Sequence, residues 1–265
     1  RGMVFALRSK GEGQPQGTLG LYPRSFYLGA RALRAVSMAD FAVNREHRSV
    51  QPALMLMRHA ALIAAQTFEL IYGSPNPRAS PIFAMASFKR IGDVHRYAKP
   101  LASAGHLSRH VPAWAARLSA PVADLALQAM DRIRELRSGS RLVCRPANWD
   151  DSAIDEIWAR RPPSTLLSER TARMLSWRFG APRHSAWQFN LAFDSDSVAR
   201  GYIVWRNIEG FVEIGDFFTD TPETRTSLLI VSFTRWIRRK GARSISLEFF
   251  GSSAVAQQLK SAGMH

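Results

Sequence analysis

A polar, basic segment between a predicted strand and a predicted helix has the residue types expected of an anion site. The strand contains Met38, Phe41 and Val43, the segment runs from Asn44 to Gln51, and the helix begins at Pro52. The first backbone N–H groups of a helix have no acceptor within the helix, and the helix dipole favours negative charge at that end. The segment therefore predicts a site for phosphate, and we interpret it as the pyrophosphate site of a nucleotide-containing cofactor.

Positive side chains strengthen this interpretation. Arg45, His47 and Arg48 lie within the segment, and guanidinium groups pair well with phosphate. The alternative is that they are solvated residues of an ordinary strand-to-helix turn. The net charge of +15 for the whole chain predicts polyanionic partners but does not choose among cofactor phosphates, nucleic acid and an anionic membrane surface.

Two carboxylates and one phenol accompany the segment. Asp40 and Glu69 lie on the strands predicted to flank the site, and Tyr72 ends the second of these strands. A carboxylate can take a proton from an attacking amine, and a phenol can protonate a leaving group. A structural ion pair is the alternative role for each carboxylate. Alternate residues of a strand face opposite sides, so the side to which Asp40 points is left open.

Other chemistry is poorly supported. His106 and His110 have helical spacing, but no nearby carboxylate or cysteine completes a metal site. The chain has no G-x-S-x-G nucleophile motif, and its glycines between Gly11 and Gly20 do not open a helix after a strand. Basic residues near Trp236 end a predicted helix, where the dipole alone favours cations. We therefore predict no metal site and no dedicated nucleic-acid motif.

The amino-acid composition is that of an ordinary globular protein. Of its 265 residues, 46% are hydrophobic and 22% are charged, which is typical of a folded soluble protein. A single cysteine, Cys144, excludes an internal disulfide framework and favours a reducing, cytoplasmic location. Charges such as Arg58 and Asp124 interrupt the apolar runs, so we expect no membrane span. Because the chain begins at Arg1, we expect its first domain to be truncated at the start.

Hydrophobic periodicity and turn residues divide the chain into three parts. We predict an N-terminal domain over residues 1–101, a connector over 102–140 and a C-terminal domain over 141–265. An amphipathic helix over 121–137 belongs to the connector. Strands are predicted at 3–7, 26–28, 38–43, 68–72, 90–101, 142–145, 187–193, 201–205, 211–219 and 244–250, and further helices at 79–87, 150–160, 168–179 and 223–240, with one more closing the chain.

The two predicted domains align at a constant offset. Residues 36–41 (VSMADF) match residues 212–217 (VEIGDF), so that Asp40 lies 176 positions before Asp216. The same offset places Ser87 and Phe88 on Gly263 and Met264. Agreement in one register predicts a degenerate internal duplication.

These residues carry a resemblance to the Gcn5-related N-acetyltransferase superfamily. The family has a loop of Arg or Gln, two residues, Gly, one residue, and Gly or Ala, and residues 48–53 (RSVQPA) occupy those places. The family then has a strand, an Asn, an Ala, often a Tyr, and a Gly-Phe pair. The matching residues are Asn76, Ala79, Phe83, Ser87 and Phe88. The chain looks like a tandem, two-domain bacterial branch of the superfamily.

The resemblance implies a fold, a cofactor and a site. The fold is α/β (α+β), with two domains that are each a mixed, mostly antiparallel twisted sheet flanked by helices. The cofactor is acetyl-CoA or another acyl-CoA, held by the N-terminal half. The implied cofactor-binding residues are Phe41, Ala42, Val43, Arg45, Arg48, Ser49, Val50, Gln51, Ala53, Asn76 and Phe83, and the catalytic candidates are Asp40, Glu69 and Tyr72.

Three departures from the family pattern put the activity in doubt. Gln51 replaces a glycine that lets the backbone approach the phosphates, and Pro52 has no N–H. Phe83 stands where the family often has a tyrosine that protonates the departing thiolate. Tyr72 and Tyr97 remain as substitutes.

We therefore predict an acyl-CoA-dependent N-acyltransferase that acts by direct transfer on a small-molecule or peptide amine. In the second domain Glu223 and Thr224 occupy the loop, so we expect cofactor only in the first, while Glu213 and Asp216 are candidates to reach the acceptor. One alternative is a catalytically silent, acyl-CoA-binding or regulatory protein. The other is a nucleic-acid-binding protein, which rests on net charge alone. An oligomer has no support in the sequence.

Overall fold

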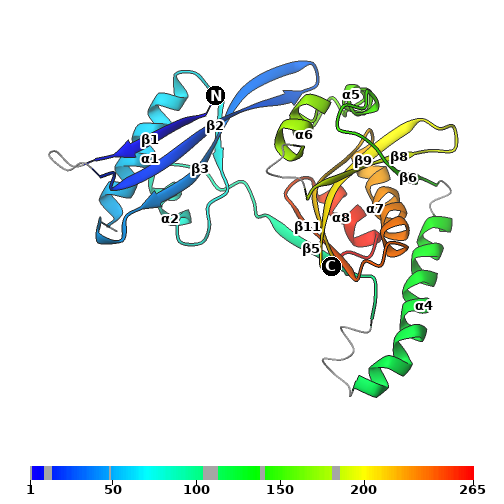
Figure 1. Ribbon diagram of the computed structural model, residues 1–265. Coiled ribbons are helices and arrows are strands. Elements are labelled where there is room, and N and C mark those ends of the chain that lie inside the picture. The colour runs from blue at the N-terminus through cyan, green and yellow to red at the C-terminus, as the bar shows by residue number, and fades with distance from the viewer. Residues whose placement is uncertain (1, 9–13, 48, 104–112, 138–140, 181–185) are drawn as a thin grey trace. The chain divides into compact units, whose positions relative to one another are not determined.

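The computed structural model describes residues 2–8, 14–47, 49–103, 113–137, 141–180 and 186–265. The chain forms two compact units: unit 1 comprises Arg1–Gly92 and Pro163–Glu169, and unit 2 comprises Asp93–Pro162 and Arg170–His265 (Figure 1). Each unit contains a mixed, mostly antiparallel sheet flanked by helices, which confirms the predicted fold class.

The sheet of unit 1 is built around a long antiparallel hairpin, formed by β2 and β3. Strand order is β1-β2-β3-β4, and β7 pairs with the end of β2 that β1 does not cover. Only the β3–β4 pair is parallel. The strands are β1 (Met3–Leu7), β2 (Gly17–Leu28), β3 (Arg31–Val43), β4 (Leu70–Gly73) and β7 (Leu166–Ser168).

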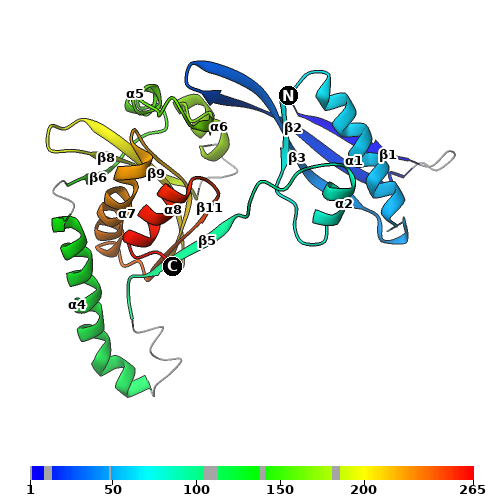
Figure 2. The same cartoon turned by 180° about the vertical axis from the view of Figure 1, so that it is seen from behind.

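Helix α1 (Val50–Ala65) connects the two parallel strands, and a short 3-10 helix, η1 (Arg45–His47), precedes it. Parallel strands need such a crossover. The apolar face of α1 packs through Leu56, Met57 and Ala60 onto Leu19 and its neighbours in the sheet. Helix α2 (Ser80–Met85) joins the same core, and both helices lie on one face of the sheet (Figure 2).

The sheet of unit 2 has helices on both faces. The order is β5-β11-β10-β9-β8-β6, and only β10 and β11 are parallel. Trp205 packs against Phe233 of α7 at 5.7 Å between ring centroids, whereas Phe218 packs against Trp158 of α5 at 5.8 Å. The elements are β5 (His95–Pro100), α4 (Ala113–Arg137), β6 (Val143–Pro146), α5 (Ala153–Ala159), α6 (Ala172–Phe179), β8 (Gln188–Phe193), β9 (Ala199–Ile208), β10 (Phe211–Thr219), α7 (Pro222–Arg238), β11 (Ser244–Phe249) and α8 (Ser253–Ser261).

The compact units do not follow the predicted boundaries at residues 101 and 141. Strand β5, predicted to end the first domain, pairs antiparallel with β11 of unit 2. Strand β7 lies among the elements of the predicted second domain, but it pairs with β2 of unit 1. The two parts of the chain thus exchange edge strands. Pairing at a sheet edge depends on residues far apart in sequence, so local periodicity cannot predict it.

Helices α2 and α8 end in the same way at the predicted offset. Phe88 N–H donates to the carbonyl of Phe83 (3.0 Å), and Met264 N–H donates to that of Leu259 (3.1 Å). The residue before each donor has a left-handed backbone, with φ of 68° at Ser87 and 82° at Gly263. This is the Schellman termination of a helix, which favours glycine at the left-handed position.

The termination of α2 predicts a stabilising substitution. A left-handed residue with a Cβ is strained by about 1 kcal/mol relative to glycine, so we expect Ser87→Gly to raise the free energy of unfolding by about that amount. The measurement is thermal unfolding followed by calorimetry. Ser87→Ala is the matched control, because it keeps the Cβ and should give no gain. Equal midpoints for the two variants would contradict the explanation.

Candidate functional site

Strand β3 contains a bulge at the candidate base. The register with β2 passes from Gly20↔Ala39 to Thr18↔Ala42, so Asp40 and Phe41 together face Leu19. Asp40 has a left-handed backbone, with φ of 53°. Met38 lies in the core, and after the extra residue Phe41 packs against the same core. Unbroken alternation would turn Asp40 towards the core, and the bulge instead leaves its carboxylate exposed.

The two parallel strands part beside this bulge. Pairing of β3 with β4 ends at Met38↔Gly73, while β3 stays paired with β2 as far as Val43. Beyond Met38 the other edge of β3 therefore has no strand partner among the described residues. Its backbone N–H groups can point at a ligand. This is the arrangement by which a central strand polarises a carbonyl oxygen.

Helix α1 begins at the same end of the sheet, two residues earlier than predicted. Its N-cap, Ser49, makes no side-chain cap hydrogen bond, and the first turn contains no acidic residue. Ser49, Val50 and Gln51 are exposed. Pro52 is the third helical residue, where its missing N–H is one that the helix would leave unpaired anyway. The start of α1 thus offers backbone donors and has no carboxylate in its own first turn.

Arg45 of η1 is exposed near this helix start. Arg48 and the side chain of His47 fall outside the described residues. The predicted role of these two residues in binding phosphate stays a prediction.

Asp40 has a partner that sequence reasoning missed. The Tyr22 hydroxyl of β2 donates a hydrogen bond to Asp40 Oδ2. This hydrogen bond is the main cause of a raised pKa for Tyr22, because the neighbouring carboxylate favours the neutral phenol. A Cβ built on Gly20 would lie 2.6 Å from the ring of Tyr22, so glycine lets the ring lie across β2. The sequence signal was the Gly20-x-Tyr22 spacing, which places both on one strand face.

Glu69 lies at the other end of the β3–β4 pair. It accepts hydrogen bonds from Arg31 Nη2 (3.1 Å) and from the backbone N–H of Arg34 (3.0 Å). The bond from Arg34 is the largest cause of a lowered pKa for Glu69. Arg34 and Asp40 are separated by about 20 Å of extended strand. The structure therefore does not bring Glu69 to the bulge, and its lowered pKa makes it a weaker base.

The remaining predicted residues are Tyr72, which lies on β4, and Asn76 and Phe83, which follow β4 in the chain. Tyr72 lies opposite Ser37 and packs edge-to-face on Phe26 at 5.4 Å. The Oδ1 atom of Asn76 accepts hydrogen bonds from the N–H groups of Arg78 (3.1 Å) and Ala79 (2.9 Å), so this side chain organises the turn into α2.

Phe83 lies beneath the point where the strands part. It is buried, and a Cβ built on Gly73 would lie 2.6 Å from its ring. Glycine is therefore required at the end of β4 for the ring to pack there. The ring therefore borders the candidate site, and it has no ionisable proton to donate.

Unit 2 repeats the bulge but fills the space beside it. The register of β10 with β9 shifts between Ile214 and Asp216, so Gly215 is the extra residue. A Cβ on Gly215 would lie 2.5 Å from the ring of Trp187. Asp216 accepts hydrogen bonds from the hydroxyl of Tyr202 (3.1 Å) and from Arg170 Nε (3.3 Å).

Tyr202 is fully buried, and burial is the main cause that raises its pKa well above 10.0. Of the two carboxylates predicted to reach an acceptor, Asp216 is thus held in a largely buried cluster. Glu213 is paired with Arg206 at 2.6 Å.

The start of α7 already carries negative charge. Asp220 is 5% exposed and pairs with Arg225 Nη1 (2.8 Å) and Arg200 Nη1 (3.2 Å). Glu223 lies in the first turn of α7. A phosphate at this helix start would meet two carboxylates, and Arg225 and Arg200 already form ion pairs with Asp220.

The described residues show neither a metal-binding cluster nor a membrane-spanning helix. These residues contain no group of three or more His, Cys, Asp or Glu side chains that could hold a metal ion. His106 and His110, considered above, lie outside the described residues. Within the same limits, no helix combines the length and apolarity needed to cross a membrane.

Solved structures with a similar fold identify the fold of this chain. No protein-family model matches this chain, and no curated protein sequence matches it. A GCN5-related N-acetyltransferase from Kribbella flavida gives a TM-score of 0.59 at 13% identity, covering 93% of this chain and 53% of its own. A probable N-acyltransferase from Enterococcus faecalis gives 0.58 at 14% identity, covering 91% and 54%. Saccharomyces cerevisiae N-myristoyltransferase with bound myristoyl-CoA and inhibitors gives 0.56 at 10% identity, covering 98% and 64%.

The chain therefore has the fold of the GCN5-related N-acetyltransferase superfamily, and the resemblance inferred from sequence is confirmed at that level. The chain spans about half the length of the first two of these structures.

The pairing of Tyr22 with Asp40 predicts a measurable change in acidity. Removing the negative charge in Asp40→Asn should lower the pKa of Tyr22 towards its ordinary value near 10.0, because the phenolate is no longer repelled. NMR titration of tyrosines labelled at Cζ measures each phenol separately. Tyr97, on β5 of unit 2, serves as the internal control, and its NMR signal should be the same in both proteins. An unchanged midpoint for Tyr22 would exclude the contact.

Proposed function

We propose that this chain is an acyl-CoA-dependent N-acyltransferase whose cofactor binds to unit 1, at the bulge of β3 and the start of α1. The observation that carries the proposal is the parting of β3 from β4 beside a helix start without acidic residues. A thioester carbonyl needs polarising donors and a pyrophosphate needs unpaired N–H groups. The two features lie at the same end of one sheet.

The binding roles follow from this placement. Exposed N–H groups of Ser49, Val50 and Gln51, helped by Arg45, hold the pyrophosphate. Backbone N–H groups within residues 41–43 donate to the thioester oxygen, and Phe83 closes the site from below. Asn76 orders the turn that follows β4. The acyl group is acetyl or a longer chain, and the fold is shared by a protein whose structure contains myristoyl-CoA.

When bound, acyl-CoA supplies an activated carbonyl carbon with a thiolate leaving group. Asp40 is the proposed base, because its carboxylate is exposed at the point where the strands part. It takes the amine proton, directly or through water, while the new C–N bond forms and the C–S bond breaks. Tyr72 is the proposed proton donor to the thiolate. Tyr22 holds the Asp40 carboxylate by its hydroxyl and acts as a positioning residue.

We further propose that unit 2 is a diverged copy of the same fold that does not bind cofactor. The helix ends that match at the offset of 176 residues, together with a bulge in each of the two corresponding strands, support the duplication. Trp187 fills the space beside the second bulge, and Arg225 and Arg200 at the start of α7 are already paired with Asp220. Unit 2 therefore contributes scaffold and no second cofactor site.

The second candidate function is a catalytically silent acyl-CoA-binding protein. Gln51, Pro52 and Phe83 each remove a feature that supports transfer in the family, and Tyr22 occupies one oxygen of the Asp40 carboxylate. Binding and turnover must therefore be measured separately.

Cofactor binding is tested by adding a carboxylate at either end of α1. Gln51→Glu places negative charge beside the proposed pyrophosphate and should weaken acetyl-CoA binding about tenfold. Gln66→Glu makes the same change at the C-cap of α1 and should leave affinity unchanged. Titration calorimetry with acetyl-CoA measures both. Absence of binding to the unsubstituted chain at millimolar acetyl-CoA, or equal weakening in both variants, would reject the proposed site.

Turnover is tested by removing the proposed base. Asp40→Asn should lower kcat about a hundredfold with little change in acyl-CoA affinity, whereas Glu69→Gln should keep kcat near its original value. Thiol release with a panel of amines measures both rates. Cys144 is buried, with a pKa raised to about 12 by burial, so it adds little background. Binding without thiol release from any amine would favour the silent protein.

A further inference from the structure

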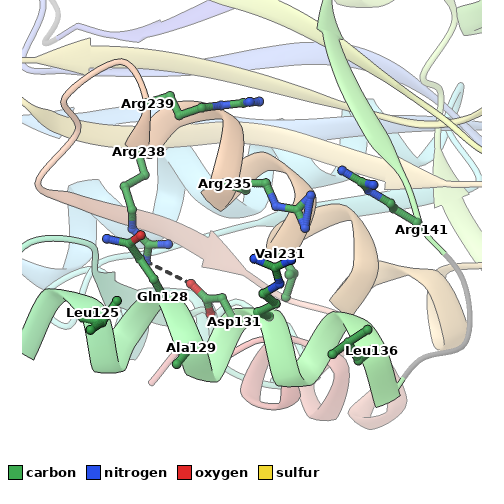
Figure 3. A pocket seen from close by; sticks show the side chains of 11 residues that line it. Leu125, Gln128, Ala129, Asp131, Leu136, Arg141, Val231, Arg235, Arg238 and Arg239 are labelled. Atoms are coloured by element: carbon green, nitrogen blue, oxygen red, sulfur yellow. Dashed lines mark hydrogen bonds and ion pairs between the residues drawn. The ribbon is translucent and has the colours of Figure 1, made fainter.

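A groove between α4 and α7 of unit 2 has no role in the proposed function. Its volume is about 1110 Å³, large enough for a segment of another molecule. Figure 3 shows Leu125, Ala129 and Leu136 on α4 and Val231, Arg235 and Arg238 on α7, with the ion pair of Asp131 and Arg238 joining the two helices. Both helices belong to unit 2.

The groove is strongly positive. Five arginines line it: Arg132, Arg141, Arg235, Arg238 and Arg239. Among the described residues that line it, Asp131 is the one carboxylate, and it already accepts hydrogen bonds from Lys99 Nζ (2.6 Å), Arg134 Nη1 (3.2 Å) and Arg238 Nη2 (2.9 Å). Burial, then the positive charges of Arg239 and Arg132, lower the pKa of Arg235. The lining residues therefore carry more positive charge than their carboxylate balances.

Helix α4 presents its apolar side chains outward. Leu125 is 67% exposed and Leu136 is 74% exposed. Among the side chains of α4 whose burial is described, only Asp131 is buried. Lys99, 3% exposed, binds this carboxylate and also donates to the carbonyl of Ala262 (2.8 Å). An internal ion pair thus holds the helix in place, and Leu125 and Leu136 have no partner that covers them among the described residues of unit 2.

We propose that this groove binds an acidic amphipathic helix of a partner protein. Such a helix has the two surfaces that the groove requires, because its apolar face covers the stripe of α4 and its carboxylates meet the arginines. Leu125 and Leu136 are separated by about 16 Å along the axis of α4, which is about three helical turns. A partner helix of that length presents apolar residues at positions i, i+4 and i+7.

Other occupants fit the groove less well. A second copy of this chain carries the same net charge of +15 and is repelled. Single-stranded nucleic acid is usually held by aromatic stacking, and none of the lining residues is aromatic. A membrane surface requires side chains that project from a convex face, whereas these arginines line a recess. The inference does not depend on the proposed acyltransferase activity.

The test uses a fluorescein-labelled peptide of about 15 residues, a length sufficient for partial helix formation, with leucines at i, i+4 and i+7 and glutamates on the flanking positions. Two further peptides serve as controls: one scrambles the same residues, and one replaces glutamate by lysine. Fluorescence anisotropy with the full chain should show the acidic amphipathic peptide binding at least tenfold more tightly than either control.

Substitutions locate the binding. Arg239→Glu and Leu136→Gln alter exposed side chains of the two walls, and each should weaken the peptide about tenfold. Arg173→Glu makes the same charge change at an exposed position on α6 and should change affinity less than twofold. Circular dichroism confirms that each variant is folded.

Several results would overturn the proposal. They are absence of binding at millimolar peptide, equal binding of the scrambled peptide, and equal loss in Arg239→Glu and Arg173→Glu. Anionic vesicles or a single-stranded oligonucleotide that bind more tightly than the peptide, and lose binding in Arg239→Glu and Leu136→Gln, would assign the groove to a membrane or to nucleic acid instead.

Discussion

One extra residue in β3 determines what unit 1 can do. The bulge at Asp40 lets Met38 and Phe41 both pack against α1 while the carboxylate between them stays exposed. Pairing with β4 ends immediately before it, so the backbone of β3 becomes available to a ligand at the place where α1 begins. A regular strand would bury Asp40 and leave no opening. The proposed cofactor site, base and helix start all depend on this interruption of a regular ladder.

Unit 2 contains the same interruption, but its side chains close it. Trp187 lies against Gly215, and Asp216 bonds with Tyr202 and Arg170. The start of α7 has its own anion in Asp220, which already forms ion pairs with Arg200 and Arg225. A bulge therefore accompanies an exposed carboxylate and an unpaired strand edge in one unit and a packed core in the other. The difference lies in whether aromatic rings and internal carboxylates occupy the space that the bulge creates.

The cationic side chains behind the net charge of +15 divide between internal ion pairs and the protein surface. Asp131 and Asp220 each form ion pairs with several Lys or Arg side chains, and these clusters join elements far apart in the chain. Breaking a buried pair of this kind by removing one partner is strongly destabilising, so these clusters hold the fold together. Among the described residues, arginines also line the groove beside α4, and Arg45 lies exposed in the segment before α1. Net charge alone does not show which cationic side chains form internal ion pairs and which lie at the surface.

The sequence determined the elements, and tertiary structure decided how they combine. Periodicity predicted β10 at its observed limits, residues 211–219, and a basic segment followed by a helix predicted α1. The fold class and the family resemblance followed from such local patterns. The exchange of β5 and β7, the pairing of Tyr22 with Asp40 and the distance of Glu69 from the bulge did not. Each of these depends on register between strands far apart in the chain, and a shift of one residue reverses the face on which every following side chain lies.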